Sequence, residues 1–98
     1  MDTIELITQE HRREILRLVW DEEKSAGELA DAFDVTFGAV SQHLARLREA
    51  DLVQVRVDGN HRFYTANRAR LSAFAPMLTA MWGTMLDSLV EKSESGDE

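Results

Sequence analysis

The fold is decided by the thirty residues from Thr36 to Thr65, TFGAVSQHLARLREADLVQVRVDGNHRFYT. The first half of this stretch has the period of a helix, because a step of about 100° per residue places Val40, Leu44 and Leu47 on one narrow stripe. That stripe must face a core. The hydroxyl of Thr36 can cap the helix, which we expect to run to about Ala50.

The second half of the stretch has the pattern of a β-hairpin. Residues 52–57 carry a β-branched side chain at every second position, and residues 61–65 provide the return strand. The Asp-Gly pair at 58–59 is a strong hairpin signal, because a tight turn needs positive φ. A two-residue loop, centred on this pair or one residue further along, places Arg56 and His61 on the same face. A two-stranded ribbon is not stable alone, so it must pack on the helices.

Further helices precede this stretch. Residues 4–20 place apolar side chains mostly at helical spacing without glycine or proline, which predicts one helix with a capped start near Thr8. Ser25 followed by Glu28 is a capping-box pattern and opens a short helix to about Phe33. A short turn then leads into the next helix. Two helices joined in this way make a helix-turn-helix.

A last, long helix is predicted over residues 68–92, where Pro76 should kink the helix or mark its regular start. Its twenty-five residues would span about 37 Å, more than one compact domain of this size covers. Each large apolar side chain left in water would forfeit about 1.5–3 kcal/mol, and a partner helix removes that cost. We therefore predict a homodimer interface that includes Leu78, Met81, Trp82, Met85 and Leu89. The alternative is a stripe that packs within one subunit.

The chain of 98 residues has room for one domain, which we place at residues 1–92, followed by an acidic tail at 93–98 that should fray. The larger α/β and barrel enzymes do not fit this length. The chain has no cysteine, which excludes disulfides and thiolate metal sites. No apolar run approaches the length of a membrane span, so we expect a cytoplasmic protein without a membrane partner. No catalytic constellation is present, because Ser41 and His43 lie two residues apart on a helix and cannot face each other.

The charge of the chain is unevenly distributed. The total is −7, but residues 36–70 carry six arginines against three acids, whereas residues 1–35 and 71–98 are net acidic. Screening limits charge fields to about 8–10 Å at physiological salt, so a basic middle can meet phosphate while the flanks stay acidic. The alternative is an ordinary scatter of solvated charges.

A helix-turn-helix followed by a hairpin wing has a direct use on DNA. An α-helix fits the major groove, and the side chains of its N-terminal half read the bases. We predict a recognition helix at residues 37–50 and a wing at residues 52–66. Gln42 can pair with adenine, and Arg46 can reach guanine or phosphate. The predicted DNA-contacting residues are Thr36, Gly38, Ala39, Ser41, Gln42, His43, Arg46, Arg56, Asn60, His61 and Arg62.

Two residues of the recognition helix have alternative roles. His43 lies about 60° from the centre of the apolar stripe, so it either contacts phosphate or is a partly buried structural histidine. It is not expected to bind a metal. Phe37 also flanks the stripe, and we expect it to pack in the core rather than contact a thymine methyl group.

Three motifs carry a family resemblance. The stretches GELADAF at 27–33, AVSQHLARLREADLV at 39–53 and DGNHRFY at 58–64 resemble the ArsR family of winged helix-turn-helix regulators. The likeness covers about residues 10–66. It implies a mainly α fold with a β-hairpin, in the order α-α-α-β-β-α. It also implies a homodimer that joins the first and last helices, which adds Ile4 and Ile7 to the predicted interface. The dimer would bind a palindromic operator, usually as a repressor.

The sequence departs from the metal-sensing members of that family. Ala30 and Ala32 stand in the helix where those members place cysteines, and residues 71–92 contain no histidine. We therefore predict no metal or other cofactor. Two other functions stay open: a protein-interaction module that uses the Met-rich last helix, and an effector-responsive regulator of the same fold.

Overall fold

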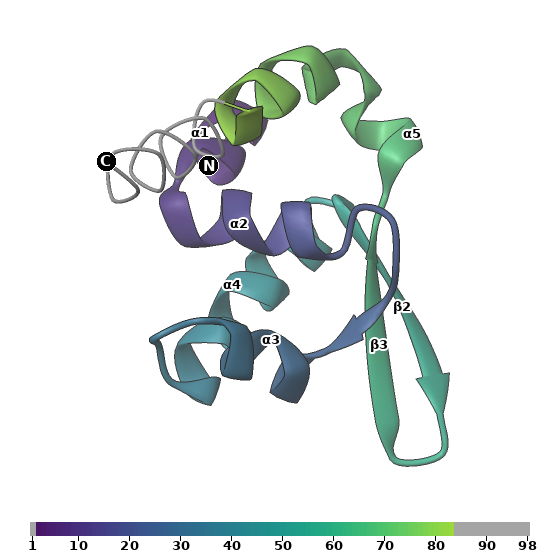
Figure 1. Ribbon diagram of the computed structural model, residues 1–98. Coiled ribbons are helices and arrows are strands. Elements are labelled where there is room, and N and C mark those ends of the chain that lie inside the picture. Colours follow the sequence, from purple (N-terminus) through teal and green to yellow (C-terminus); the bar gives the residue numbers. More distant parts are fainter. Residues whose placement is uncertain (1, 84–98) are drawn as a thin grey trace, which may run out of the picture.

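The computed structural model describes residues 2–83 and has the winged helix-turn-helix fold that the sequence predicts. Figure 1 shows the helices on one side of a long hairpin, with α1 and α5 at one end of the molecule. The elements, in chain order, are α1 (Thr3–Thr8), α2 (Glu10–Leu18), β1 (Lys24–Ser25), α3 (Ala26–Ala32), α4 (Phe37–Glu49), β2 (Val53–Asp58), β3 (His61–Ala66), α5 (Arg68–Leu71) and the 3₁₀ turn η1 (Ser72–Phe74). A further helix covers residues 75–83.

The N-terminal segment forms two helices instead of the single helix predicted. The chain breaks at Gln9, whose backbone is extended (φ −65°, ψ 130°). Each helix has its own cap: Glu5 N–H donates to Asp2 Oδ1 at 2.9 Å, and Arg12 N–H donates to Gln9 Oε1 at 2.9 Å. Gln9, and not Thr8, is therefore the capping residue of the second helix.

The core is one contiguous apolar cluster drawn from every major element. The stripe predicted for α4 lies at its centre, because Val40, Leu44 and Leu47 are all fully or almost fully buried. The other buried apolar residues are Leu6, Ile7, Ile15, Leu16, Val19, Leu29, Leu52, Val53, Ala66, Leu71, Leu78 and Trp82. This core anchors α4 by one stripe and leaves other side chains of the helix exposed.

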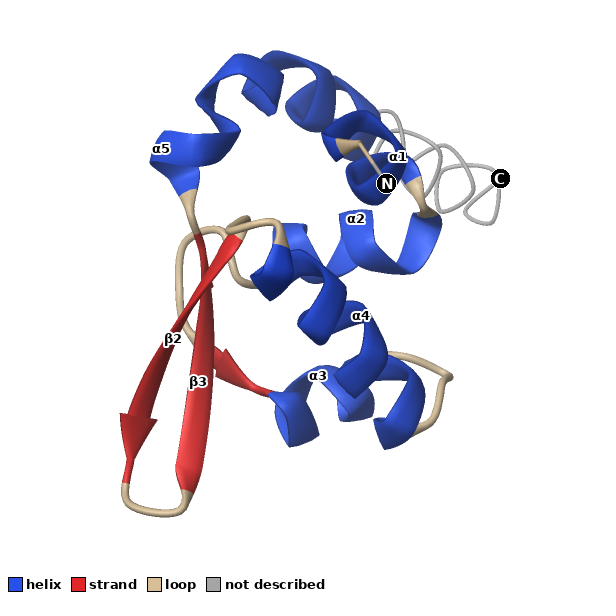
Figure 2. Ribbon diagram, turned by 180° about the vertical axis from the view of Figure 1, so that it is seen from behind, coloured by secondary structure: helices blue, strands red, loops and turns tan. Residues whose placement is uncertain are grey.

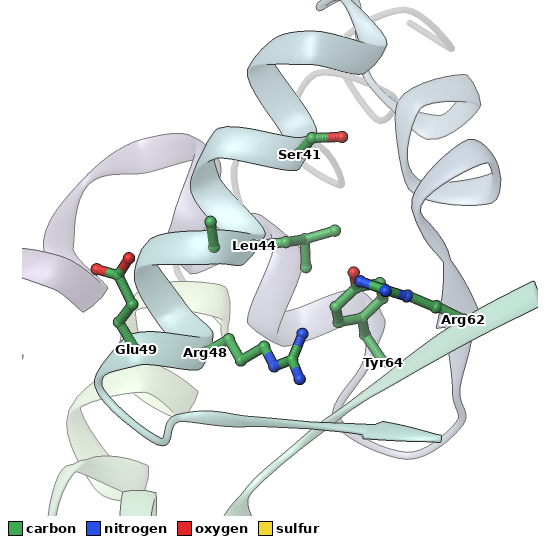
Figure 3. A pocket seen from close by; sticks show the side chains of 7 residues that line it. Ser41, Leu44, Arg48, Glu49, Arg62 and Tyr64 are labelled. Atoms are coloured by element: carbon green, nitrogen blue, oxygen red, sulfur yellow. The ribbon is translucent and has the colours of Figure 1, made fainter. Parts of the chain in front are cut away.

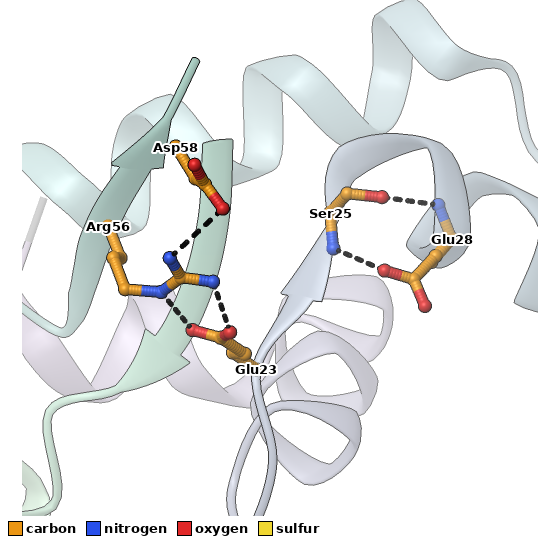
Figure 4. Close-up of polar contacts among 5 residues, drawn as sticks. All are labelled: Glu23, Ser25, Glu28, Arg56 and Asp58. Atoms are coloured by element: carbon orange, nitrogen blue, oxygen red, sulfur yellow. Dashed lines mark hydrogen bonds and ion pairs between the residues drawn. The ribbon is translucent and has the colours of Figure 1, made fainter. Parts of the chain in front are cut away.

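Local hydrogen bonds fix the ends of α3 and α4, the two helices of the helix-turn-helix. The capping box of α3 is present: Glu28 N–H donates to Ser25 Oγ at 3.1 Å, and Ser25 N–H donates to Glu28 Oε1 at 3.0 Å (Figure 4). At the start of α4, Ala39 N–H donates to Thr36 Oγ1 at 3.1 Å, as predicted. Past the C-terminal end of α4, Asp51 takes a left-handed φ of +61°. Leu52 N–H then donates to Leu47 O at 2.9 Å, which completes a Schellman motif.

The hairpin follows the predicted pattern, with its loop on Gly59-Asn60. Asp58 pairs with His61 and Arg56 pairs with Phe63, so Arg56 and His61 share a face as expected. Gly59 has a φ of +63°, the conformation for which a turn selects glycine. A third strand, β1, was not predicted. It pairs Lys24 with Tyr64 and connects the wing to the start of α3.

The C-terminal segment packs on the N-terminal helices within one subunit. The prediction of one continuous helix from residue 68 is wrong in its first part, because α5 ends at Leu71 and the turn η1 follows it. Regular helix begins beside Pro76, which is one of the two outcomes expected for that proline. The indole Nε1 of Trp82 donates to Arg13 O at 3.2 Å, and its ring meets that of Trp20 edge-on at 5.3 Å.

The predicted dimer interface stays a prediction, and its residues occupy different positions in the single chain. Ile7, Leu78 and Trp82 are buried in the core of a single chain, so no partner is needed to cover them. Ile4 is 53% exposed, and Met81 is half-buried. Met85, Leu89 and the tail at 93–98 lie outside the described residues. No helix among residues 2–83 is long and apolar enough to cross a membrane.

Candidate nucleic-acid interface

A groove lies between α4 and the hairpin. The N-terminal end of α4 and the hairpin tip lie at the same end of the molecule, away from α1 and α5 (Figures 1 and 2). Between α4 and β3 is a cleft of about 590 Å³. Nearer the tip is a second cleft of about 390 Å³, and the two share Ser41, Arg62 and Tyr64. The two clefts therefore form one continuous depression, which we call the α4–wing groove.

Four elements line this groove. The wider part is bordered by Ser41, Leu44, Ala45, Arg48, Glu49, Arg62 and Tyr64 (Figure 3). The part near the tip adds Ser25, Ala26, Gly27, Phe37, Asn60 and His61. The capping box fixes the start of α3 against the groove, and the β1–β3 pairing fixes the wing beside it.

Two arginines converge in the groove. Arg48 from α4 and Arg62 from β3 both extend toward the ring of Tyr64, whereas Glu49 points away from it (Figure 3). Both guanidinium groups are exposed, and neither forms an ion pair within residues 2–83. The hydroxyl groups of Ser41 and Tyr64 are further hydrogen-bonding groups in the same groove. Such a set suits a phosphate, which accepts charge-assisted hydrogen bonds from arginine.

Arg56 is placed differently from the prediction. Because Arg62 and Tyr64 face α4, the pleat of the hairpin turns Arg56 to the opposite face. There its guanidinium donates to both carboxylate oxygens of Glu23, at 2.6 and 2.9 Å (Figure 4). The same guanidinium stacks over the ring of Phe63 at 4.7 Å. The hydrogen bond from Arg56 lowers the pKa of Glu23. Arg56 therefore does not belong to the groove, and Glu23 offsets its charge.

His43 also lies outside the groove. It is half-buried against α2, where its Nδ1 is 3.3 Å from Nη1 of Arg12 and its ring centre is 5.6 Å from that of His11. Burial lowers the pKa of His43, and the charge of Arg12 lowers it further. The structural role that the sequence left open for this histidine matches its position better than phosphate contact does.

Arg46 occupies a third position. It is exposed but borders a separate depression with Leu6, Glu49 and Ala50, on the side of α4 that faces α1. The other predicted contacts are distributed as follows: Ser41, Asn60, His61 and Arg62 line the groove, whereas Thr36, Gly38, Ala39 and Gln42 lie on the first two turns of α4 or at its cap. Among these last four, Ala39 is half-buried and the others are exposed.

Phe37, Arg48 and Tyr64 were missed as site residues. The expectation that Phe37 packs in the core is wrong, because its side chain is 59% exposed. Phe37 is the first residue of α4. The first turn of this helix lies beyond the edge of the core, and Val40 is the first residue of α4 that is buried in it. A signal was available in the sequence: Phe37, Ser41 and Arg48 lie within about 40° of one another around the helix. That stripe is the one facing the wing.

The described residues do not form a metal site. Within residues 2–83 no three histidine, aspartate or glutamate side chains gather closely enough to hold a metal ion. The whole chain also lacks cysteine.

Comparisons with known proteins agree with this geometry. The sequence model of the bacterial regulatory protein arsR family matches residues 9–55. The transcriptional activator HlyU of Vibrio cholerae is 33% identical over 79 residues, which cover 81% of this chain and 73% of HlyU. The regulator KmtR of Mycobacterium tuberculosis is 38% identical over 64 residues, covering 65% of this chain and 49% of KmtR.

Solved structures extend the likeness to the fold. The crystal structure of a possible transcriptional regulator for arsenical resistance aligns with a TM-score of 0.71 at 33% identity, covering 94% of this chain and 96% of the other. HlyU aligns with a TM-score of 0.72 and covers 81% of this chain and 86% of its own. These relatives are transcriptional regulators, not enzymes. The chain belongs to the ArsR family of DNA-binding winged-helix transcriptional regulators.

Proposed function

We propose that this chain acts in the cytoplasm as a homodimeric repressor that binds a palindromic operator through the α4–wing groove. The observation that carries this proposal is the convergence of Arg48 and Arg62 on Tyr64 in that groove, with neither arginine in an ion pair within residues 2–83. A phosphate held there would fix the register of α4 in the adjacent major groove.

In this arrangement the first turns of α4 read the bases. Gln42 is exposed near the N-terminal end of the helix, where a bidentate contact with adenine is geometrically favoured. Gly38 has open space around it, since an added Cβ would come no closer than 3.9 Å to a side-chain atom. The backbone of this turn can therefore approach the DNA closely. Asn60 and His61 at the wing tip would contact the neighbouring backbone or minor groove.

The proposed dimer interface lies at the end of the molecule opposite the hairpin tip. Ile4 on α1 is 53% exposed, and Met81 is half-buried. Of the predicted interface residues within 2–83, these two are the ones that a single chain leaves accessible. Two copies joined there would present two α4 helices, which must lie about 34 Å apart to enter successive major grooves. A palindromic operator follows from the two-fold symmetry of such a pair.

Repression needs no more than occupancy of an operator that overlaps a promoter. The related HlyU of Vibrio cholerae is named an activator, so the sign of regulation depends on where the operator lies. A reporter gene driven by the native promoter, with its operator in the natural position, tests the sign directly. We expect expression to fall when the protein is present. A rise in expression from the native promoter would contradict repression without affecting DNA binding.

The first test is the selection of bound sequences from random duplex DNA, with the mass of the complex measured by light scattering. The expected result is an enriched palindrome, with half-sites about one helical turn apart, bound by two chains. An enriched site without two-fold symmetry, bound by one chain, would contradict the dimer. No enriched sequence at any salt concentration would contradict operator binding and would favour a protein-interaction module.

The residues assigned to the dimer can be tested separately. Ile4→Asp should shift the protein from dimer to monomer in sedimentation equilibrium, because a carboxylate would be buried at the interface. Val57→Asp is the matched control, since Val57 is similarly exposed but lies on the wing. A dimer that survives Ile4→Asp would remove α1 from the interface.

A further inference from the structure

The first turn of α4 holds a large apolar side chain in solvent. Phe37 is 59% exposed, and within residues 2–83 only Ile4 and Val57 are comparable among the large hydrophobic side chains. Phe37 follows the capping residue Thr36 directly, so the capped first turn of α4 fixes its backbone. A side chain in this position is presented by a rigid element and not by a loop.

The core does not account for Phe37. The buried stripe of α4 begins one turn later at Val40, which is fully buried. Phe37 instead lies on the side of α4 that carries Ser41, and both line the α4–wing groove with Asn60 near the hairpin tip. The aromatic ring is therefore part of the surface that the proposed function places against DNA.

The major groove offers one apolar feature that such a ring can contact. Each thymine presents its C5-methyl group there, next to the polar edge that hydrogen-bonding side chains read. An exposed phenylalanine at the start of a recognition helix matches that group in polarity and position. Neighbouring Gly38 has no side chain to hold the DNA away.

We propose that Phe37 reads the C5-methyl group of one thymine in each operator half-site and thereby sets base preference at that position. This inference rests on the proposed function. It assigns the apolar part of recognition to Phe37 and leaves the hydrogen-bonding part to Gln42. The wing residues Arg62 and Tyr64 contact the phosphate backbone of the DNA, so they contribute affinity but no base preference.

The test replaces thymine by deoxyuridine, which removes the methyl group and changes nothing else in the base pair. Duplexes of the selected operator are made with one symmetric pair of thymines replaced at a time, and each Kd is measured by fluorescence anisotropy. Loss of one buried methyl group corresponds to about a fourfold weaker Kd, and so to about a fifteenfold loss for the pair of half-sites. We expect this loss at one symmetric position.

The variant Phe37→Ala completes a double-mutant cycle. It should bind the thymine operator more weakly than the wild type does and should show no further loss with deoxyuridine at that position. Val57→Ala is the matched control, because it removes an equally exposed apolar side chain from the wing and should keep the full methyl dependence. Because Phe37 is outside the core, the variant should keep the wild-type melting temperature.

Three results would overturn the inference. One is an operator in which no thymine shows methyl dependence. Another is the same methyl dependence in Phe37→Ala as in the wild type. The third is a change of oligomeric state in Phe37→Ala with unchanged DNA affinity, which would make Phe37 a contact between copies. All three presuppose an enriched operator, so they are distinct from failure of the proposed function, in which no operator is found.

Discussion

The two arginines of the α4–wing groove should control how DNA affinity responds to salt. Arg48 and Arg62 are exposed and free of ion pairs within the described part of the chain, so each can neutralise a phosphate without breaking a contact of its own. Each phosphate neutralised contributes about 0.9 to the slope of log K against log salt concentration. In a homodimer, Arg48→Ala removes two such contacts and should reduce the slope by about 1.8. Arg62→Ala should do the same.

The expected size is well within measurement. A slope reduced by about 1.8 means that a rise from about 50 to about 200 mM salt costs the variant about twelvefold less affinity than it costs the wild type. Anisotropy titrations of a labelled operator at five salt concentrations give the slope.

Arg68→Ala is the control for this measurement. Arg68 is an exposed arginine on α5 that pairs with Asp21 at 3.3 Å, at the end of the molecule away from the wing tip. The slope of log K against log salt concentration for Arg68→Ala should equal that of the wild type. The assignment of the groove to the phosphate backbone would be refuted if neither groove variant changed the slope. It would also be refuted if Arg68→Ala reduced the slope as much as the groove variants do.

Two further predictions concern the folded state. Burial and then the charge of Arg12 lower the pKa of His43 from its ordinary value of 6.5, so the unfolded chain holds this proton more tightly than the native state does. The contribution of His43 to stability is therefore fully present above pH 6.5 and is lost as the pH falls below 6.5 and through the lowered pKa of the native state. Below this pH, the free energy of unfolding measured in urea should fall more steeply for the wild type than for His43→Asn. Parallel dependence on pH in the two proteins would contradict the prediction. Asp51→Gly should stabilise the protein by about 1 kcal/mol and raise the melting temperature by about 4–8 °C, because glycine adopts the left-handed φ of +61° without strain. Gly59→Ala, with a φ of +63°, should have the opposite effect, and an unchanged melting temperature in Asp51→Gly would refute the strain argument.

The fold was predictable because its signals are local. The burial of Val40, Leu44 and Leu47 follows from a repeat that the sequence shows directly. The hairpin follows from alternation interrupted at Gly59, where the turn requires positive φ. By contrast, the break at Gln9 has no glycine or proline to mark it, and the two-residue strand β1 is too short to have a periodicity.

The candidate site was less predictable, because periodicity places a residue around a helix without revealing what lies opposite. His43 and Arg46 lie on faces of α4 that turn toward α2 and α1, and Arg48 lies on the face that turns toward the wing. Only the packing of these elements distinguishes the faces. The pairing of Arg56 with Glu23 joins residues 33 positions apart, so no local pattern could predict that Arg56 is already engaged.

The net charge of −7 is compatible with DNA binding once the ion pairs are considered. Away from the groove, acids already hold the arginines of three elements: Glu14 holds Arg17, Asp21 holds Arg68, and Glu23 holds Arg56. These pairs leave little unbalanced positive charge on those surfaces, and screening beyond about 8–10 Å keeps their fields local. The groove combines two exposed arginines with a single acid that points away from them. A polyanion approaching the groove would therefore meet exposed arginine side chains whose charge no ion pair within residues 2–83 offsets.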